Sequence, residues 1–385
     1  MHKSGGGPLC RDLRGISSTA MSWGLNAGDV YTPLLDLLIR PELDQVVYQD
    51  WDAIPSLVST LALGAPWIRR LTIIKNQSSV DYTIFPKLEY LEHGGNFSYA
   101  DYMALTLLPH LRVLRLQRIS ESRLPPTKRS TFAVFLSLRE LVLFDIDIEF
   151  AEAVTDSVAP NLRTLQVWSL KHEKIIVAVN HFLETSPLLE DLYVQFILPW
   201  EELQLKRHER INRLQLVSLD HQSGETQGVE LDWIREAFPE LHDLTIQASP
   251  SPFYRARLTF RTFQSLVIHH DDHFRSLTVT LHVPTSSVPD IPPSQWNTSL
   301  RHLKFPWIAI NTVDIDPFVK YLATLCPNVE TLEIIDLFSL AAGGIEEGWN
   351  ISLGDEIRDR SVKKFFEAQA DGRTRVEIME KVFDE

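Results

Sequence analysis

One run of residues in this sequence has the side chains that bind transition metals. It consists of His269, His270, Asp271, Asp272 and His273. Imidazole and carboxylate groups are common ligands of Zn²⁺ and related ions. Adjacent residues of an extended chain point to opposite sides, so no more than two or three of these side chains could converge on one ion. We therefore interpret the run as a polar turn that leaves a strand, and we predict no metal site.

The rest of the sequence has no pattern typical of an enzyme. It contains no Gly-rich phosphate loop, no GxSxG nucleophile elbow, no HExxH motif and no CxxC pair. Its Ser, His and Asp residues are scattered, and no spacing marks a catalytic triad. Acidic pairs such as Glu201-Glu202 are typical of a solvated surface. We predict a protein that is not an enzyme, with no catalytic residue, no metal and no cofactor.

Side chains suited to binding another protein are the remaining candidates for function. Aromatic residues bracketed by Gln and Arg are typical anchors of protein interfaces. Phe144, Trp168 and Tyr193 are expected on three successive strands. The predicted binding surface consists of Arg115, Gln117, Phe144, Gln166, Trp168, Tyr193, Gln195, Gln215 and Gln247. The alternative is that the aromatic residues pack against their neighbours or under a loop.

These positions follow from a pattern that recurs along the chain: an apolar residue, two residues, an apolar residue, one residue and an apolar residue. The last two apolar residues share one face of a strand, and the residues between and just after them point away from the core. The copies are Ile68/Leu71/Ile73, Leu111/Leu114/Leu116, Leu138/Leu141/Leu143, Leu162/Leu165/Val167, Leu189/Leu192/Val194, Ile211/Leu214/Leu216, Leu241/Leu244/Ile246, Phe263/Leu266/Ile268, Leu300/Leu303/Phe305 and Val329/Leu332/Ile334.

Three further copies depart from the pattern. Leu43/Val46/Tyr48 is weaker, and Leu88/Leu91 has His93 in its third apolar place. Phe274/Leu277/Val279 follows its neighbour too closely for a full repeat, so we interpret it as the second strand of a hairpin-like insertion.

A proline often stands just before the pattern, as at Pro109, Pro187 and Pro327, and residues with helical spacing precede it. Proline ends a helix, so each unit reads as strand, loop, amphipathic helix and proline turn. Most copies are separated by a length within the roughly 20–29 residues of a leucine-rich repeat. The predicted fold is an α/β leucine-rich-repeat solenoid of about a dozen repeats, with a curved parallel sheet inside and helices outside.

Composition narrows the possible partners and compartments. The 385 residues include 44% hydrophobic residues and carry a formal net charge of −14. This acidic balance argues against non-specific binding to nucleic acid and against docking to anionic lipid. Cys10 and Cys326 lie too far apart in sequence to suggest a disulfide framework, which indicates a reducing compartment. With no secretory signal and no apolar stretch of membrane-spanning length, the expected location is the cytoplasm or the nucleus.

The chain is expected to divide into three parts. Residues 1–29, rich in Gly and Ser, are expected to form a disordered or loosely packed leader. Residues 30–340 form the leucine-rich-repeat solenoid, and residues 341–385 form a segment that caps its exposed end.

The repeats resemble those of fungal F-box proteins. Cys326-Pro327-Asn328-Val329, followed by Leu332 and Ile334, is similar to the CPNLxxLxL unit of cysteine-containing leucine-rich repeats. The stretches 34–43 and 65–73 look like the first repeats of that family. The resemblance covers about Leu34 to Asp336. Residues 1–29 do not match the Leu-Pro-x-Glu-like start of an F-box, so we expect the F-box to be missing or trimmed.

The resemblance implies a role in substrate recognition for a cullin ubiquitin ligase. In that family the F-box binds a linker subunit of the ligase, and the repeats capture the protein to be ubiquitinated. The expected partner is a protein ligand on the concave face and, where an F-box lies upstream, the linker subunit. The alternatives are a stand-alone leucine-rich-repeat scaffold or regulator unconnected to ubiquitin and, less favoured, an enzyme that uses residues 269–273.

Overall fold

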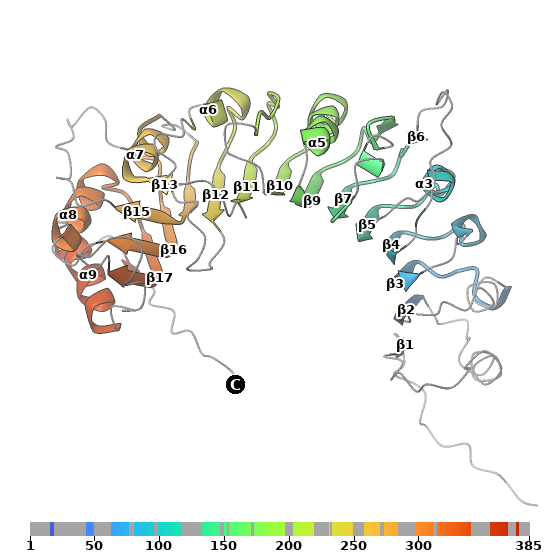
Figure 1. The fold of residues 1–385 in the computed structure, drawn as a ribbon, viewed down its shortest axis with the longest axis horizontal. Helices are drawn as coiled ribbons and strands as arrows, with labels where there is room; N and C mark the ends of the chain where they lie inside the picture. The colour runs from blue at the N-terminus through green and yellow to red at the C-terminus, as the bar shows by residue number, and fades with distance from the viewer. Residues whose placement is uncertain are drawn as a thin grey trace, which may run out of the picture. The chain divides into compact units, whose positions relative to one another are not determined.

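A computed structural model shows how this sequence folds (Figure 1). It forms two compact units, which are described separately: unit 1 comprises residues 1–166 and 185–188, and unit 2 comprises residues 167–184 and 189–385. The structure describes residues 16–18, 44–49, 63–76, 81–95, 97, 99–117, 133–146, 150–151, 154–170, 173–196, 203–218, 231, 233–248, 258–269, 273–283, 297–310, 314–339, 355–368 and 375–376.

Unit 1 is built on strands that follow one another in chain order across a sheet. They run β1 (Ile16–Ser18), β2 (Gln45–Gln49), β3 (Arg70–Asn76), β4 (Tyr90–Gly95), β5 (Val113–Gln117) and β7 (Glu140–Phe144), and each neighbouring pair is parallel. The connections contain η1 (Tyr82–Ile84), α3 (Tyr99–Leu105), and a separate parallel pair of β6 (Ala133–Val134) and β8 (Ser157–Val158). Strand β9 (Thr164–Leu170) contains the boundary between the units.

Unit 2 repeats the arrangement, and most of its helices are longer than α3. Its parallel strands are β10 (Asp191–Phe196), β11 (Arg213–Ser218), β12 (Asp243–Ala248), β14 (Ser276–Val279), β16 (His302–Ile310), β17 (Thr331–Ser339) and β18 (Arg375–Val376). The short strands β13 (Leu258–Thr259) and β15 (Leu281–Val283) extend the sheet beside the end of β16. The helices are α5 (Glu173–Thr185), α6 (Trp233–Ala237), α7 (Phe260–His269), α8 (Ile315–Leu325) and α9 (Asp355–Ala368).

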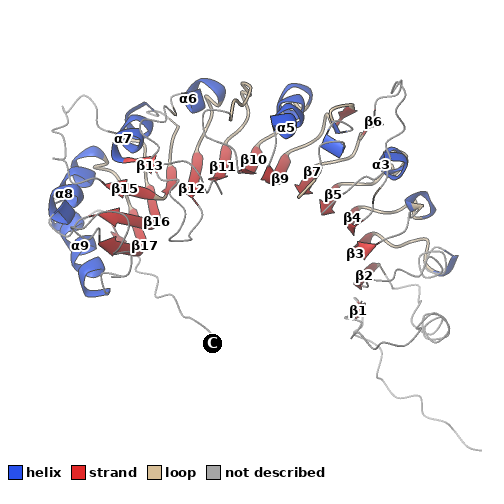
Figure 2. Ribbon diagram, viewed as in Figure 1, coloured by secondary structure: helices blue, strands red, loops and turns tan. Residues whose placement is uncertain are grey.

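The repeated apolar residues form the core, as predicted. Leu114 and Leu116 of β5 and Leu192 and Val194 of β10 are at most 2% exposed, while the residues between them are partly exposed. This alternation places one side of each strand under the helices and leaves the other side open. The helices lie together on one side of the strands within each unit (Figure 2). This is the predicted leucine-rich-repeat fold.

A recurring pair of backbone hydrogen bonds fixes the start of ten of the described strands. The carbonyl of the residue before one strand accepts the N–H groups of two consecutive residues at the start of the next strand. In unit 1, for example, Arg112 O accepts from Arg139 N at 2.8 Å and from Glu140 N at 3.0 Å. The same bonds form at five carbonyls in each unit: those of Asp44, Arg69, Glu89, Arg112 and Arg139, and those of Glu190, Asn212, His242, Arg275 and Arg301. We call this series the entry ladder.

The turn before each strand also repeats. The residue three positions before the first apolar residue of the pattern is buried, and its carbonyl commonly accepts the N–H of that apolar residue. Ala65 O accepts from Ile68 N at 3.2 Å, and Cys326 O accepts from Val329 N at 3.3 Å. At Asn297 the side chain takes this role, because its Oδ1 accepts from Leu300 N at 2.8 Å. A tight turn therefore precedes the strand whether or not a proline is present.

One predicted strand is wrong. Phe263, Leu266 and Ile268 belong to helix α7, and the strand of this repeat is β14, which contains Leu277 and Val279. Strand β14 is not the second strand of a hairpin, because it pairs in parallel with β12 and β16. The error has a physical origin: apolar residues three apart fit a helix as well as the repeat pattern, and the following Val267 is buried as well.

The irregular copy at Leu88 and Leu91 is a full strand. His93 of β4 is 1% exposed and takes the inward place that an apolar residue fills elsewhere. Its Nδ1 is hydrogen-bonded to the hydroxyl of Tyr82, and its ring lies 4.9 Å from that of Phe97. Burial is the main cause that raises the pKa of Tyr82, and Asp101 adds to it. The buried imidazole is thus accommodated by a polar partner from η1.

The predicted end segments lie mostly outside the described residues. Within residues 1–29 only Ile16–Ser18 is described, as β1. Within residues 341–385, helix α9 packs against α8, and β18 pairs with β17. The helix there runs from Asp355 to Ala368. The three-part division of the chain stays a prediction.

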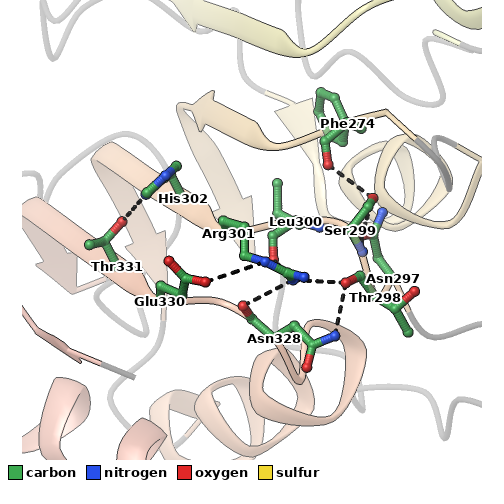
Figure 3. A network of polar contacts seen from close by, with 10 residues as sticks. All are labelled: Phe274, Asn297, Thr298, Ser299, Leu300, Arg301, His302, Asn328, Glu330 and Thr331. Carbon is green, nitrogen blue, oxygen red and sulfur yellow. Dashed lines mark hydrogen bonds and ion pairs between the residues drawn. The ribbon is translucent and has the colours of Figure 1, made fainter. Parts of the chain in front are cut away.

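Asn297 allows a test of how much the turns contribute to stability (Figure 3). Its fully buried side chain accepts from Ser299 N and Leu300 N and donates to Val267 O at 2.7 Å. We expect Asn297→Ala to lower the free energy of unfolding by about 1–3 kcal/mol, because it leaves buried groups without partners. Urea unfolding followed by circular dichroism measures this loss.

Asn328 provides the matched control for this substitution. It is exposed, and its side chain donates one hydrogen bond, to Thr298 O at 2.8 Å. We expect Asn328→Ala to cost less than about 1 kcal/mol, since water can replace its bond. Equal losses for the two variants would contradict the proposed role of the buried side chain.

Candidate protein-binding surface

The nine residues predicted to bind a ligand all lie on strands. They occupy β5, β7, β9, β10, β11 and β12, and all are partly exposed. The structure places them at the outward positions of the strands, between or beside buried core residues. That they bind a ligand stays a prediction.

Two of the predicted residues of unit 1, Arg115 and Gln117, belong to a polar network. Arg115 donates to Glu140 Oε1 from Nη2 at 2.7 Å and from Nε at 3.1 Å. Its guanidinium carbon also lies 5.6 Å from the ring centre of Tyr90, and that of Arg70 lies 4.5 Å from the same ring. Gln117 donates to the carboxylate of Glu92. Arg115 and Gln117 are therefore held by neighbouring strands.

Phe144 and Gln166 are the other two predicted residues of unit 1. The strand register sets Phe144 opposite Gln117 and Val142 opposite Arg115. Phe144 is partly exposed at the end of β7, and Gln166 is partly exposed on β9. The aromatic side chain thus extends the row that begins with Gln117.

The network changes the ionisation of two of its members. Burial, with the hydrogen bond and the charge of Glu92, raises the pKa of Tyr90 to about 12. Burial alone would lower the pKa of Arg115, but its contact with Glu140 and the nearby Tyr90 and Glu92 raise it on balance. At neutral pH the network therefore contains a neutral phenol and a firmly charged guanidinium.

In unit 2 the predicted residues form an aromatic pair beside amides. The ring centres of Trp168 and Tyr193 are 4.3 Å apart, with an angle of 31° between the rings. The register sets Tyr193 opposite Gln215, and sets Gln195 and Gln247 on either side of Val217. Burial raises the pKa of Tyr193 to about 12, so its hydroxyl stays protonated at neutral pH. We call Trp168, Tyr193, Gln195, Gln215 and Gln247 the unit 2 patch.

Sequence reasoning missed one outward position on each strand. The residue just before the first strand leucine also points outward, and this row contains Arg70, Tyr90 and Glu140. In unit 2 it contains His302, whose Nδ1 lies 2.6 Å from Thr331 Oγ1. The strand alternation that identified the other positions applies here too, and it could have found this row.

The structure does not bring the metal-type residues together in the part that it describes. His269 ends helix α7, His273 is exposed before β14, and residues 270–272 lie outside the described residues. The ring centres of His273 and His242 are 6.1 Å apart. Among the described residues, no group of three or more His, Cys, Asp or Glu side chains could hold a metal ion.

Known proteins offer likenesses in structure but none in sequence. No family model matches this chain. No curated protein matches it either. The crystal structure of the Rad7–Elc1 complex of yeast matches with 12% identity and a TM-score of 0.39, covering 85% of each chain. A leucine-rich-repeat protein of Leptospira interrogans matches with 12% identity and a TM-score of 0.33, covering 88% of this chain and 90% of that one.

No helix in the described part of the chain has the length and apolar character needed to cross a bilayer.

The Tyr90 network allows a titration test. Glu92→Gln should lower the pKa of Tyr90 from about 12 toward its ordinary value, because it removes the acceptor charge that holds the phenolic proton. The difference in ultraviolet absorbance between each protein and its Tyr90→Phe counterpart isolates this tyrosine during an alkaline titration. An unchanged pKa would show that Glu92 does not hold the proton.

The raised pKa also predicts how stability depends on pH. The unfolded chain loses the Tyr90 proton near pH 10, while the folded chain keeps it until about pH 12. The folded state therefore binds more protons in this range, and the contribution of Tyr90 to stability falls as the pH rises from 10 to 12. Tyr90→Phe should remove this part of the decline in a series of urea-unfolding curves.

Proposed function

We propose that this chain is a recognition protein that binds a protein ligand on the outward side of its strands and carries no enzymatic activity. The observation that supports it is the unit 2 patch, where an aromatic pair lies beside three glutamines on parallel strands. Tyrosine and tryptophan bury a large area at a small entropic cost, and they dominate many interfaces. The glutamine amides can donate and accept hydrogen bonds around these anchors.

The form of the unit 2 patch favours a macromolecular ligand over a small molecule. Its residues come from successive strands of an open sheet surface. Small-molecule sites instead surround most of their ligand. Parallel strands lie roughly 5 Å apart, so residues on four strands span a distance suited to a peptide segment or a protein surface.

We further propose that the ligand is a substrate to be delivered to a cullin ubiquitin ligase. The support for this is the similarity of the Cys326-Pro327-Asn328-Val329 repeat to the repeats of F-box proteins. The thiol of Cys326 is fully buried, and burial raises its pKa. The cysteine of this repeat therefore serves packing. The competing function is a stand-alone scaffold unconnected to ubiquitin.

Trp168→Ala tests the binding surface. We expect it to weaken capture of the native ligand by tenfold or more, because the loss of an aromatic anchor typically costs about 2 kcal/mol or more. Capture by the immobilised variant from native-cell extract, quantified by mass spectrometry against the parent protein, measures this change. Trp233→Ala is the control, since Trp233 lies on helix α6 and is also partly exposed.

The two variants must also retain the circular dichroism spectrum of the parent protein. Capture that is unchanged by Trp168→Ala, or equally reduced by Trp233→Ala, would exclude the unit 2 patch as the binding surface.

Purification from the native cell separates the two proposed functions. The ligase function predicts that a cullin and its linker subunit accompany the chain together with substrates. Recovery of a different protein without ligase subunits would support the stand-alone scaffold and reject the tie to ubiquitin.

A further inference from the structure

A second surface lies in unit 1, at the turns that lead into β5 and β7. Six exposed residues from these two turns form it: Leu107, Pro109, His110, Arg112, Leu136 and Arg139. We call this set the basic–apolar edge. The two turns are neighbours, because Arg139 N donates to Arg112 O at 2.8 Å and Ser137 Oγ donates to Pro109 O at 2.5 Å. The edge is therefore held by the entry ladder.

The apolar part of this edge is unusually exposed. Leu107 is 72% exposed and Leu136 is 69% exposed. Val134 of β6, two residues before Leu136, is 41% exposed. Single exposed leucines are ordinary, but two neighbouring turns that expose leucine and proline together, beside an exposed valine, indicate a contact surface.

The basic residues of this edge, His110, Arg112 and Arg139, have few acidic partners. Within the described part of the chain no residue pairs with the guanidinium of Arg139 or with the imidazole of His110. Nη1 of Arg112 lies 3.5 Å from Oε2 of Glu89. The same carboxylate also pairs with Arg69, whose Nη1 lies 3.5 Å from Oε1. The nearby carboxylate of Glu140 is bound to Arg115. The edge is thus positive on a chain whose net charge is −14.

In unit 2, by contrast, the side chain of Arg301 has partners for its guanidinium group (Figure 3). Arg301 occupies the same place before its strand as Arg139 does. Its Nη1 donates to the carbonyls of Thr298 at 2.8 Å and Asn328 at 3.3 Å, and its Nε lies 3.4 Å from Glu330. Arg139 lacks such partners among the described residues, which leaves its donors available to a ligand.

We propose that the basic–apolar edge binds an acidic peptide segment that also carries apolar side chains. Arg139 and Arg112 would receive its carboxylates, and Leu107 and Leu136 would contact its apolar groups. Guanidinium groups bind carboxylates with two parallel hydrogen bonds, which suits an acidic side chain. A nucleic acid fits less well, because its phosphate backbone would leave the exposed leucines uncovered. This surface is separate from the unit 2 patch and does not depend on the proposed function.

Fluorescence anisotropy with a defined probe tests the proposal. The probe is a short fluorescein-labelled peptide in which glutamate and leucine alternate, and two control peptides replace either all glutamates by glutamine or all leucines by serine. We expect the full-length chain to bind the first peptide and to bind each control at least about tenfold more weakly, since each lacks one kind of contact. Added salt should weaken binding of the first peptide.

Variants of the chain locate the binding. Arg139→Gln and Leu136→Ser should each weaken binding about tenfold. Arg275→Gln should leave it unchanged, because Arg275 occupies the equivalent ladder position in unit 2 and is also exposed. Trp168→Ala should also leave it unchanged, which separates this surface from the unit 2 patch.

Three results would overturn the proposal. One is the absence of binding to the glutamate–leucine peptide. Another is an equal loss in Arg275→Gln and Arg139→Gln, which would indicate a general charge effect. The third is tighter binding of a single-stranded DNA oligonucleotide of equal charge, which would identify the edge as a phosphate-binding surface.

Discussion

The entry ladder is the interaction on which the rest of the structure depends. One carbonyl before a strand accepts two N–H groups from the next repeat, and among the described residues this happens five times in each unit. These bonds use only backbone atoms, so they set the register of adjacent strands whatever the side chains are. Once the register is fixed, the inward positions stack leucine on leucine, and the outward positions form rows that cross several strands.

The register that the ladder fixes also determines which positions can carry polar, charged or aromatic side chains. The inward positions must be apolar, or must carry a buried partner as His93 does with Tyr82. The outward and turn positions have no such requirement and can accept charge or aromatic rings. The Tyr90 network, the unit 2 patch and the basic–apolar edge all occupy those positions. Recognition residues can therefore change while the core of each repeat is kept.

Sequence alone predicted the strands and the outward positions well, because the pattern of alternating burial is local. It failed at Phe263 and Leu266, where spacing alone cannot separate a helix from a strand and tertiary packing decides. It placed Trp168 and Tyr193 on the open side but could not show that their rings lie 4.3 Å apart. It also missed Tyr90 and Glu140, whose importance comes from partners on adjacent strands, which only the register reveals.

The distance along the chain between ladder positions varies widely, although the bonds do not. It is 20 residues from Arg69 to Glu89 and 33 residues from His242 to Arg275, and both steps end in the same pair of hydrogen bonds. Closing a longer loop costs little extra entropy. An insertion or deletion on the helical side is therefore absorbed within its own repeat and leaves the neighbouring strands in place. The length of one repeat is therefore not constrained by the length of its neighbours.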